Sequence, residues 1–330
     1  MHIVNKILII RFSSIGDIVL TSPVIRCIKN QLPEAELHFL IKKQYVPLLI
    51  NNPYLNKIHH FDKKLKEIIP ELIEENFDFI VDLQKNRRSM YVRSCINRPY
   101  GTFNKLNKKK WLLTNFKINL LPKVHIVDRY FQAVKKLNVA NDLQGLDYFI
   151  PENDKVDITK ILPETFHKGY AVLIAGSKQN TKQIPYEKML EICNAINTSV
   201  VLLGSKEDVN KAERVSEILG KKVFNACGIF NINQSASFVE QATAVITADT
   251  GLMHIAAALR KKVISVWGNT VPDFGMYPYY PKDKENYHII EVKNLKCRPC
   301  SKLGYKKCPK KHFRCMIDID VQNIIKLDNG

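Results

Sequence analysis

One segment late in the chain has the residue types of an anion-binding loop. Asp249, Thr250 and Gly251 lie between an apolar segment and a stretch with helical spacing that carries His254. Free backbone N–H groups at the start of a helix bind phosphate, and the helix dipole favours the negative charge. Gly251 allows the backbone to approach a ligand closely. A second interpretation, in which Asp249 or Thr250 only caps the helix, is equally compatible with these residues.

Two further segments of the same half follow apolar runs. Gly176 and Ser177 leave room for a phosphate that Lys182 could neutralise, although the spacing is not that of a P-loop. Taken alone, this segment is typical of an ordinary solvated loop. Asp208, next to Glu207, could accept hydrogen bonds from ribose hydroxyls. An acidic first turn that complements the helix dipole explains these two acids equally well.

Near the start of the chain, the segment Arg11-Phe12-Ser13-Ser14-Ile15-Gly16-Asp17 also follows an apolar run. Asp17 stands where a predicted strand ends and a helix begins. It could be a helix cap, and the dipole there would lower its pKa and weaken it as a base. A weak base still serves if the acceptor hydroxyl becomes acidic as the new bond forms.

Several enzyme classes lack their characteristic motif in this chain. There is no G-x-G-x-x-G of nicotinamide-dependent oxidoreductases, no G-x-S-x-G nucleophile elbow and no H-E-x-x-H metal helix. No RNA-binding signature, zinc finger or basic region followed by heptads occurs either. These absences exclude several enzyme classes.

The segments that must position these residues alternate between strand and helix, which predicts parallel sheets with both faces covered. Apolar strand-like runs occupy 6–12, 37–41, 57–61, 77–83, 170–175, 199–203, 223–226, 244–247 and 263–267. Helical spacing occupies 18–31, 43–51, 63–76, 124–138, 185–197, 207–219, 234–242 and 252–259. Residues 98–123 are less regular and very basic.

The 330 residues suit two domains of ordinary size. We predict an N-terminal α/β domain over 1–155, a linker over 156–168 and a C-terminal α/β domain over 169–330 that ends in a cysteine-rich tail. In open α/β sheets, ligands bind outside the carboxyl ends of the strands. The candidate loops stand at such ends, and two domains facing each other would form a central cleft there.

Taken together, these loops resemble glycosyltransferase family 9, the lipopolysaccharide heptosyltransferases. The most specific segments are residues 11–19 (RFSSIGDIV) and 249–257 (DTGLMHIAA), and the resemblance covers nearly the whole chain. It implies a GT-B fold, with two Rossmann-like domains whose parallel sheets face a central cleft. It also implies an inverting, metal-independent transfer of a sugar, heptose from ADP-heptose, to a lipopolysaccharide-core or related lipid-linked glycan acceptor.

The resemblance also implies roles for individual residues. Asp17 matches the family's catalytic base. The positions that match donor contacts are Gly16, Ser177, Lys182, Asp208, Asp249, Thr250, Gly251 and His254, with Glu207 as the second choice for the ribose. The positions that match the acceptor side are Arg11, Ser13, Ser14 and Arg88.

Two alternatives remain open at this point. One is a GT-B transferase that uses another nucleotide sugar. The other is a non-catalytic basic module on the same fold that binds a membrane or nucleic acid, and such a module has no need of Asp17.

The net charge, 50 − 32 = +18, favours an anionic partner. The expected partners are a nucleotide-sugar donor, an anionic lipid-linked glycan and the cytoplasmic face of the inner membrane, and no nucleic acid is expected. No apolar run reaches the roughly 20 residues that span a bilayer. We therefore expect a cytoplasmic protein, peripheral at the membrane. Lys105, Lys108, Lys109 and Lys110, followed by Trp111, could contact lipid headgroups, or they could form a solvated basic loop.

The tail carries Cys297, Cys300, Cys308 and Cys315 at the spacing of a metal knuckle. Catalysis is expected to require no cofactor. A structural zinc at these cysteines is one hypothesis, and packed thiols without a metal are the alternative.

Overall fold

The computed structural model describes residues 4–328, and the chain separates into two compact units. The first unit comprises the chain up to Lys105 together with Val124–Pro151. The second comprises Leu106–Lys123 and the chain from Glu152 onward. Both units are α/β, as predicted.

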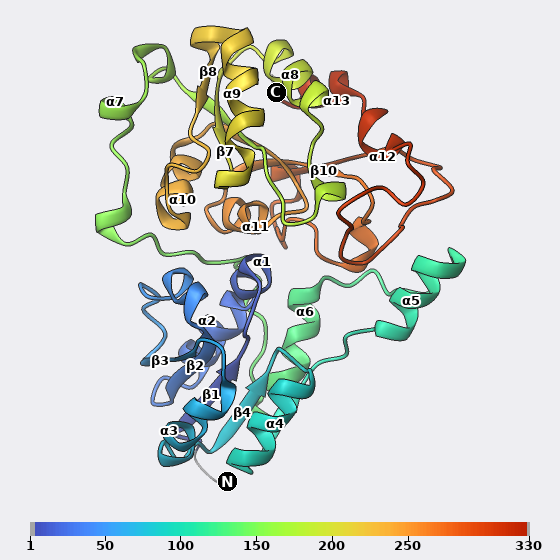
Figure 1. Ribbon diagram of the computed structural model, residues 1–330. Coiled ribbons are helices and arrows are strands. Elements are labelled where there is room, and N and C mark those ends of the chain that lie inside the picture. Colours follow the sequence, from blue (N-terminus) through green and yellow to red (C-terminus); the bar gives the residue numbers. More distant parts are fainter. Residues whose placement is uncertain (1–3, 329–330) are drawn as a thin grey trace. The chain divides into compact units, whose positions relative to one another are not determined.

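The first unit contains a parallel sheet in the order β3-β2-β1-β4-β5 (Figure 1). Its strands are β1 (Lys6–Ile10), β2 (Glu36–Lys42), β3 (Lys57–Phe61), β4 (Phe79–Asp82) and β5 (Tyr100–Thr102). Strand β1 is central, with Ile7 aligned to both Leu37 and Phe79. Its continuous apolar run is what a strand covered on both faces requires.

Helices cover this sheet on both faces. Leu8 and Ile10 pack with Leu72 of α3 and Val92 of α4 in one apolar cluster. The helices of the unit are α1 (Ile15–Val19), α2 (Ser22–Gln31), α3 (Ile69–Glu74), α4 (Arg87–Ile96) and α6 (Ile126–Tyr130). In this unit, three stretches predicted as α-helix are wholly or partly 3-10 helix: η1 (Lys43–Leu48), η2 (Leu65–Ile68) and η3 (Phe131–Leu137). In η1, Pro47 cannot donate a helical hydrogen bond.

The second unit contains a parallel sheet in the order β11-β10-β9-β6-β7-β8. Its strands are β6 (Tyr170–Ile174), β7 (Ser199–Leu203), β8 (Val223–Asn225), β9 (Ala244–Ala248), β10 (Lys262–Trp267) and β11 (Tyr287–Glu291). The sequence analysis missed β5 and β11. Both are edge strands, and the short β5 and the half-buried β11 lack the long apolar runs of the central strands.

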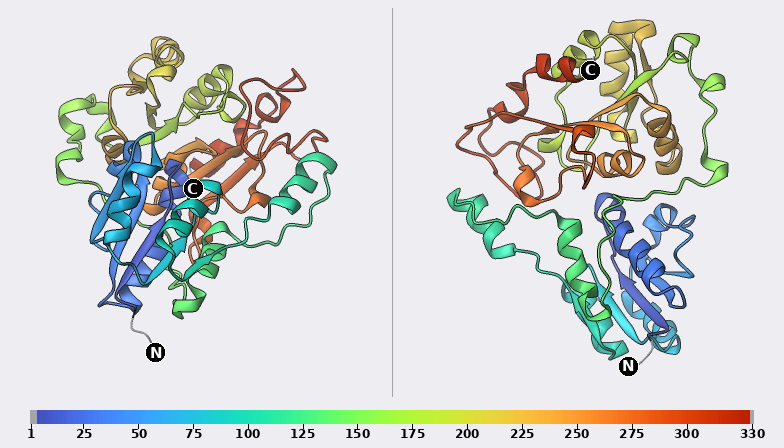
Figure 2. Two further views of the ribbon diagram at one scale, coloured as in Figure 1. Left: turned by 60° about the horizontal axis from the view of Figure 1, so that its bottom comes forward. Right: turned by 180° about the vertical axis from the view of Figure 1, so that it is seen from behind.

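The helices of the second unit are α5 (Asn107–Phe116), α7 (Ile158–Ile161), α8 (Tyr186–Ala195), α9 (Val209–Leu219), α10 (Ile232–Gln241), α11 (Gly251–Ala258), α12 (Arg314–Ile317) and α13 (Val321–Asp328). Helices α8, α9 and α13 lie side by side (Figures 1 and 2). Met189, Val215 and Ile324 from these three helices share one core cluster with the sheet. Helices α10 and α11 pack against each other.

The unit boundaries differ from the predicted 1–155, 156–168 and 169–330 in two respects. The second unit begins at Glu152, so it includes residues 152–155 and the predicted linker. Residues 106–123 fall in the sequence of the first domain but belong to the second unit. The reason is packing, because Leu113 of α5 is buried against Val271 and Phe274. Among the described residues, no helix is both long enough and apolar enough to cross a bilayer.

Candidate active site

Both sheets place their candidate loops at the point where the strand order reverses. In the first sheet this point lies between β1 and β4, and in the second between β6 and β9. Ligands of open α/β sheets bind at the carboxyl ends of the strands at such a point. The loop with Asp17 follows β1, and the loop with Arg88 follows β4. Likewise, the loop with Lys182 follows β6, and Asp249 follows β9.

Asp17 is the third residue of α1, and Ser14 precedes the helix as its N-cap. The backbone N–H and the hydroxyl of Ser14 donate to Asp17 Oδ2 at 3.2 and 2.9 Å. The other oxygen, Oδ1, lies 2.5 Å from Arg11 Nη2. The Asp17 side chain is 25% exposed. The carboxylate is therefore oriented by two neighbours and still reaches the surface of its unit.

Arg11 is buried, and its guanidinium donates hydrogen bonds to groups of the first unit. Its Nε donates to Ser13 O at 3.0 Å, and its Nη1 donates to Leu83 O at 2.5 Å and to Tyr130 Oη at 3.2 Å. Burial opposes the charge of Arg11, but the adjacent Asp17 carboxylate raises its pKa above the ordinary value. Burial also raises the pKa of Tyr130 to about 12, so its hydroxyl stays protonated. Arg11 thus pairs with Asp17 and donates to groups of its own unit, and its acceptor-side role stays a prediction.

Arg88 differs from Arg11 in having no carboxylate partner within residues 4–328. Its guanidinium lies over the rings of Phe12 and Phe61, 5.7 and 5.0 Å from their centroids. Arg88 is the second residue of α4. The N-cap of this helix is Asn86, whose side chain accepts from Ser89 N at 3.0 Å. A cation held on aromatic faces is ordered without being neutralised, as binding an anionic acceptor requires.

The remaining predicted positions of this loop lie around Asp17. Ser14 is exposed and Ser13 is half-buried, whereas Gly16 is buried inside the first turn of α1. The turn is held to the neighbouring loop by Phe12 N, which donates to Gln84 Oε1 at 2.9 Å. The two loops at this end of the sheet are therefore tied together by Arg11 and Gln84.

In the second unit, Lys182 and Asp249 form an ion pair between the loops after β6 and β9. Lys182 Nζ lies 2.5 Å from Asp249 Oδ2, and that oxygen also accepts from Thr270 Oγ1 at 3.0 Å. Both charged side chains are mostly but not fully buried. The two residues are 67 positions apart in the sequence, so the fold brings them together.

Thr250 is the N-cap of α11, and its hydroxyl accepts from Met253 N at 3.3 Å. Thr250 and Gly251 are half-buried at the start of this helix, next to Asp249. His254 is buried one turn further along α11. The helix start, Lys182 and Asp249 thus combine N–H donors, a cation and an acceptor at the β6–β9 switch point, which suits a phosphorylated sugar ligand.

Asp208 occupies a less open position than a ribose contact would need. Its Oδ2 accepts from the Ser205 N–H at 2.9 Å and the Ser205 hydroxyl at 2.7 Å. An ideal Cβ at Gly176 would lie 2.0 Å from this same oxygen, so Asp208 needs a glycine there. Asp208 and the N-cap Ser205 thus form a capping box just before α9, which agrees with the second interpretation given above, an acidic group in the first turn. Ser177 is half-buried and Glu207 exposed on the same side of the sheet.

Two supporting residues were not recognised from the sequence. Arg298, in the cysteine-rich tail, donates to the backbone carbonyls of Trp267, Gly268 and Thr270 and pairs with Glu291 at 2.9 Å. It thereby holds the loop that carries Thr270, the partner of Asp249. No local pattern marks Arg298, because its partners come from a distant strand end.

The second supporting residue, Tyr305, joins the tail to the loop that carries Lys182. Tyr305 N donates to Thr181 Oγ1 at 2.7 Å, and Tyr305 O accepts from Thr181 N at 3.1 Å. The tail after β11 therefore positions two loops of the candidate donor site.

The zinc hypothesis for the tail is unsupported. Across the described residues, no three sulfurs of Cys297, Cys300, Cys308 and Cys315 lie within 4.8 Å of one another. Cys315 is buried in the core cluster of the sheet, and burial raises its pKa to about 12. Burial likewise raises the pKa of Cys300 to about 11. These two thiols are therefore protonated, and for Cys315 the structure agrees with the packed-thiol alternative.

Comparisons with known proteins agree with this geometry. The fold is that of the two-domain GT-B glycosyltransferases: the structure of E. coli ADP-heptose lps heptosyltransferase II superposes with a TM-score of 0.74 at 20% identity, covering 98% of this chain and 97% of that one. The family model of glycosyltransferase family 9 (heptosyltransferase) matches residues 66–310. The chain belongs to glycosyltransferase family 9, and it is a glycosyltransferase.

Curated relatives agree along most of the chain. Lipopolysaccharide heptosyltransferase 1 of Campylobacter coli is 25% identical over 288 residues, which cover 80% of this chain and 84% of the relative. Lipooligosaccharide heptosyltransferase 2 of Haemophilus influenzae is 24% identical over 323 residues, which cover 91% and 93%. The family resemblance and the GT-B fold predicted from the sequence are thereby confirmed.

Proposed function

We propose that this enzyme transfers heptose from ADP-heptose to a lipopolysaccharide-core acceptor, with inversion at the anomeric carbon. The main support is the group formed by Lys182, Asp249 and the start of α11 at the β6–β9 switch point. The similarity to lipopolysaccharide heptosyltransferases supports heptose as the sugar and lipopolysaccharide as the acceptor. The similarity to the E. coli ADP-heptose lps heptosyltransferase II supports ADP as the carrier.

In the proposed reaction, the Asp17 carboxylate takes the proton of an acceptor hydroxyl. The hydroxyl oxygen bonds to the anomeric carbon while the bond from that carbon to the ADP diphosphate breaks. A single displacement of this kind inverts the configuration. The transition state carries positive charge on the sugar and negative charge on the leaving diphosphate, and stabilising that negative charge accelerates the step.

Fixed protein groups are proposed to hold the leaving diphosphate. Lys182 is a flexible point charge that can exchange its Asp249 partner for a phosphate oxygen. The N–H groups at the start of α11 add donors beside it. Asp249, released by Lys182 and held by Thr270, can then accept hydrogen bonds from sugar hydroxyls. We propose on this basis that no divalent ion takes part.

A membrane contact is proposed for residues 106–123, which we term the α5 segment. Trp111 and Phe116 are 56% and 59% exposed. Their rings pack against each other with centroids 5.2 Å apart. Lys108 and Lys109 are exposed on the same helix. Leu113 anchors the segment to the second unit. Aromatic rings beside lysines favour the headgroup region of an anionic bilayer, with about 1 kcal/mol from each lysine near the surface.

The donor is tested by a thermal-shift screen of the full chain with ADP, GDP and UDP, followed by transfer assays with the corresponding sugars. We expect stabilisation by ADP and turnover of ADP-heptose only. Stabilisation by UDP or GDP in place of ADP would point to a different nucleotide sugar. Stabilisation by none of the three would contradict the donor site itself.

The membrane contact is tested separately, by co-sedimentation with vesicles containing phosphatidylglycerol or only phosphatidylcholine. Binding is expected only to the anionic vesicles. Trp111→Ser with Phe116→Ser should abolish it, whereas Ile218→Ser with Ile229→Ser, a matched pair of exposed apolar residues in the same unit, should not. Equal loss in both double variants would contradict the role of the α5 segment.

A further inference from the structure

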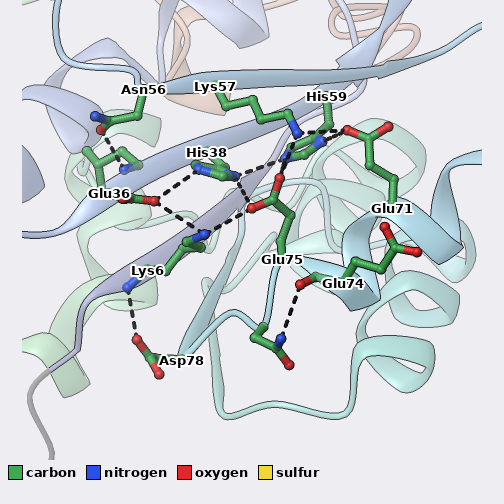
Figure 3. Close-up of polar contacts among 12 residues, drawn as sticks. Lys6, Glu36, His38, Asn56, Lys57, His59, Glu71, Glu74, Glu75 and Asp78 are labelled. Atoms are coloured by element: carbon green, nitrogen blue, oxygen red, sulfur yellow. Dashed lines mark hydrogen bonds and ion pairs between the residues drawn. The ribbon is translucent and has the colours of Figure 1, made fainter.

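A buried pair of histidines lies in the first unit, away from the residues that the proposed reaction uses. His38 is the third residue of β2 and His59 the third residue of β3 (Figure 3). In the parallel register His59 aligns with Leu40, so the two histidines lie diagonally on one face of the sheet. Glu75, which directly follows α3, points toward both rings (Figure 3). Asp17 follows the carboxyl end of β1. Glu75 of this cluster instead pairs with Lys6, at the amino end of β1.

Three ligand atoms converge in this cluster at distances that suit a tetrahedral metal ion. His38 Nδ1 lies 2.9 Å from His59 Nε2 and 3.7 Å from Glu75 Oε2. His59 Nε2 lies 3.8 Å from Glu75 Oε1. Bonds of about 2.1 Å in a tetrahedral site place neighbouring ligand atoms about 3.4 Å apart. Across the described residues, this is the group of three such side chains whose ligand atoms all lie within 4.8 Å of one another.

The second nitrogen of His59 has the partner that metal-binding histidines usually have. His59 Nδ1 lies 2.5 Å from Glu71 Oε1. A carboxylate on the far nitrogen fixes the ring and leaves the near nitrogen as an acceptor for a metal. Both rings are buried, and an imidazole binds a metal through a nitrogen that carries no proton.

The surrounding charges can accommodate an added cation. Lys6 Nζ and Lys57 Nζ hold Glu75 at 3.0 and 2.7 Å. Each lysine also has a second carboxylate within 3.3 Å, Glu36 for Lys6 and Glu71 for Lys57. If Glu75 bound a metal ion, Lys6 would still pair with Glu36 and Lys57 with Glu71. Three glutamates against two lysines leave one negative charge to offset the ion.

We propose that His38, His59 and Glu75 bind a divalent transition-metal ion of the zinc class. The ion joins β2, β3 and the end of α3, three elements that meet at the amino-terminal edge of the sheet. Its role is structural, because the candidate catalytic loops stand at the opposite edge. Glu75 is 14% exposed while His59 is fully covered, so the carboxylate side is where the ion enters and where water completes the coordination.

The experiment uses the full-length chain carrying Cys297→Ser and Cys300→Ser, so that the tail thiols do not bind the probe. After treatment with a chelator, the protein is titrated with Co²⁺ and followed by its visible absorption. One Co²⁺ per chain with tetrahedral bands is expected, with no sulfur-to-metal band, and Zn²⁺ should displace it and raise the Tm.

A matched pair of variants separates a ligand from a neighbouring charge. Glu75→Gln and Glu36→Gln remove one negative charge each from the same cluster. Glu75 faces the two nitrogens that converge, whereas Glu36 is 54% exposed and lies beside the other nitrogen of His38, Nε2. We expect Glu75→Gln to weaken Co²⁺ binding at least tenfold, because loss of even an outer partner weakens metal sites 10- to 100-fold. Glu36→Gln should weaken it far less.

Equal affinity in the two variants, or no binding of Co²⁺ and Zn²⁺ at all, would overturn the proposal. Should Glu75→Gln fail to fold, X-ray absorption of the zinc-loaded parent decides the question. The proposal requires scattering from two imidazoles, and a spectrum of oxygen ligands alone refutes it. None of these measurements depends on the donor or the acceptor, so failure of the proposed transferase reaction would leave their outcome unchanged.

Discussion

The same four-residue pattern occurs after a strand in each unit, and the two copies have different surroundings. Ser14 to Asp17 follows β1, and Ser205 to Asp208 follows β7. In both, the serine hydroxyl and N–H donate to one oxygen of the aspartate three residues later. The Asp17 side chain is 25% exposed beside Arg11, whereas that of Asp208 is 5% exposed beside a glycine.

This difference shows that the Ser-x-x-Asp pattern predicts the local hydrogen bonds of the aspartate but not whether its carboxylate is accessible to a ligand. Asp208 is enclosed because β6 and β7 are neighbours and Gly176 lets its carboxylate pack against the next strand end. Asp17 stands at the switch point of its sheet, and its side chain is 25% exposed. We therefore assign chemistry to Asp17 and a structural role to Asp208, and the predictions below test that assignment.

The largest effect is expected for Asp17→Asn. The amide keeps the shape and an acceptor for Ser14 but cannot take a proton, so the transfer rate should fall at least ~10²-fold. Nucleotide affinity, measured by calorimetry with ADP, should not change. Asp62→Asn, an exposed aspartate of the same unit, serves as the control. A loss below tenfold in Asp17→Asn would exclude this residue as the general base.

The next largest effect is expected for Lys182→Met. Removing a hydrogen bond to a charged group costs about 1.5–3 kcal/mol, so ADP affinity should fall about 10- to 100-fold. Lys178→Met, an exposed lysine of the same loop, makes the same change in net charge and should have little effect. If both variants lose ADP affinity equally, general attraction of ADP to the basic surface explains the binding. The Lys182–Asp249 pair would then have no specific role in it.

Asp208→Ala should mainly reduce stability. Loss of a buried cap and its partner bonds costs about 1–3 kcal/mol, which for a unit of this size lowers the Tm by several degrees. ADP affinity at a temperature where the variant is folded should change less than threefold. Glu207→Ala is the exposed neighbour for comparison. A tenfold loss of ADP affinity with unchanged Tm would instead assign Asp208 to the ribose.

The smallest effect is expected from pH, and it should appear in one unit only. His38 has a folded-state pKa of about 4 against 6.5 for the free side chain. The unfolded chain therefore binds the proton first, and stability is lost as the pH falls from about 6.5 to 4. The loss grows across this range because the folded state has the lower pKa.

Hydrogen exchange in the presence of a chelator checks this prediction, with rates corrected for their intrinsic pH dependence. Protection of β2 and β3 should decline between pH 6.5 and 4.5 more than protection of β9 and β10. His38→Gln should remove the difference. A parallel decline in both units would mean that acid acts on the molecule generally and not through the histidine pair.

The sequence alone determined the fold class, the central strands and the local caps of this protein. Continuous apolar runs such as Ile7 to Ile10 predict buried parallel strands, and turn residues between them predict the loops, because both depend on neighbours close in the chain. The family motifs around Asp17 and Asp249 were likewise readable, since each is a short segment at a strand end.

Only the tertiary structure decided which of these residues share a site and which are enclosed. Lys182 meets Asp249 across 67 residues, Arg298 holds the loop of Thr270, and Leu113 joins the second unit from within the sequence of the first. His38, His59 and Glu75 carried no recognisable motif until strand register and α3 brought them together. Such contacts depend on packing between distant segments, which residue spacing along the chain does not encode.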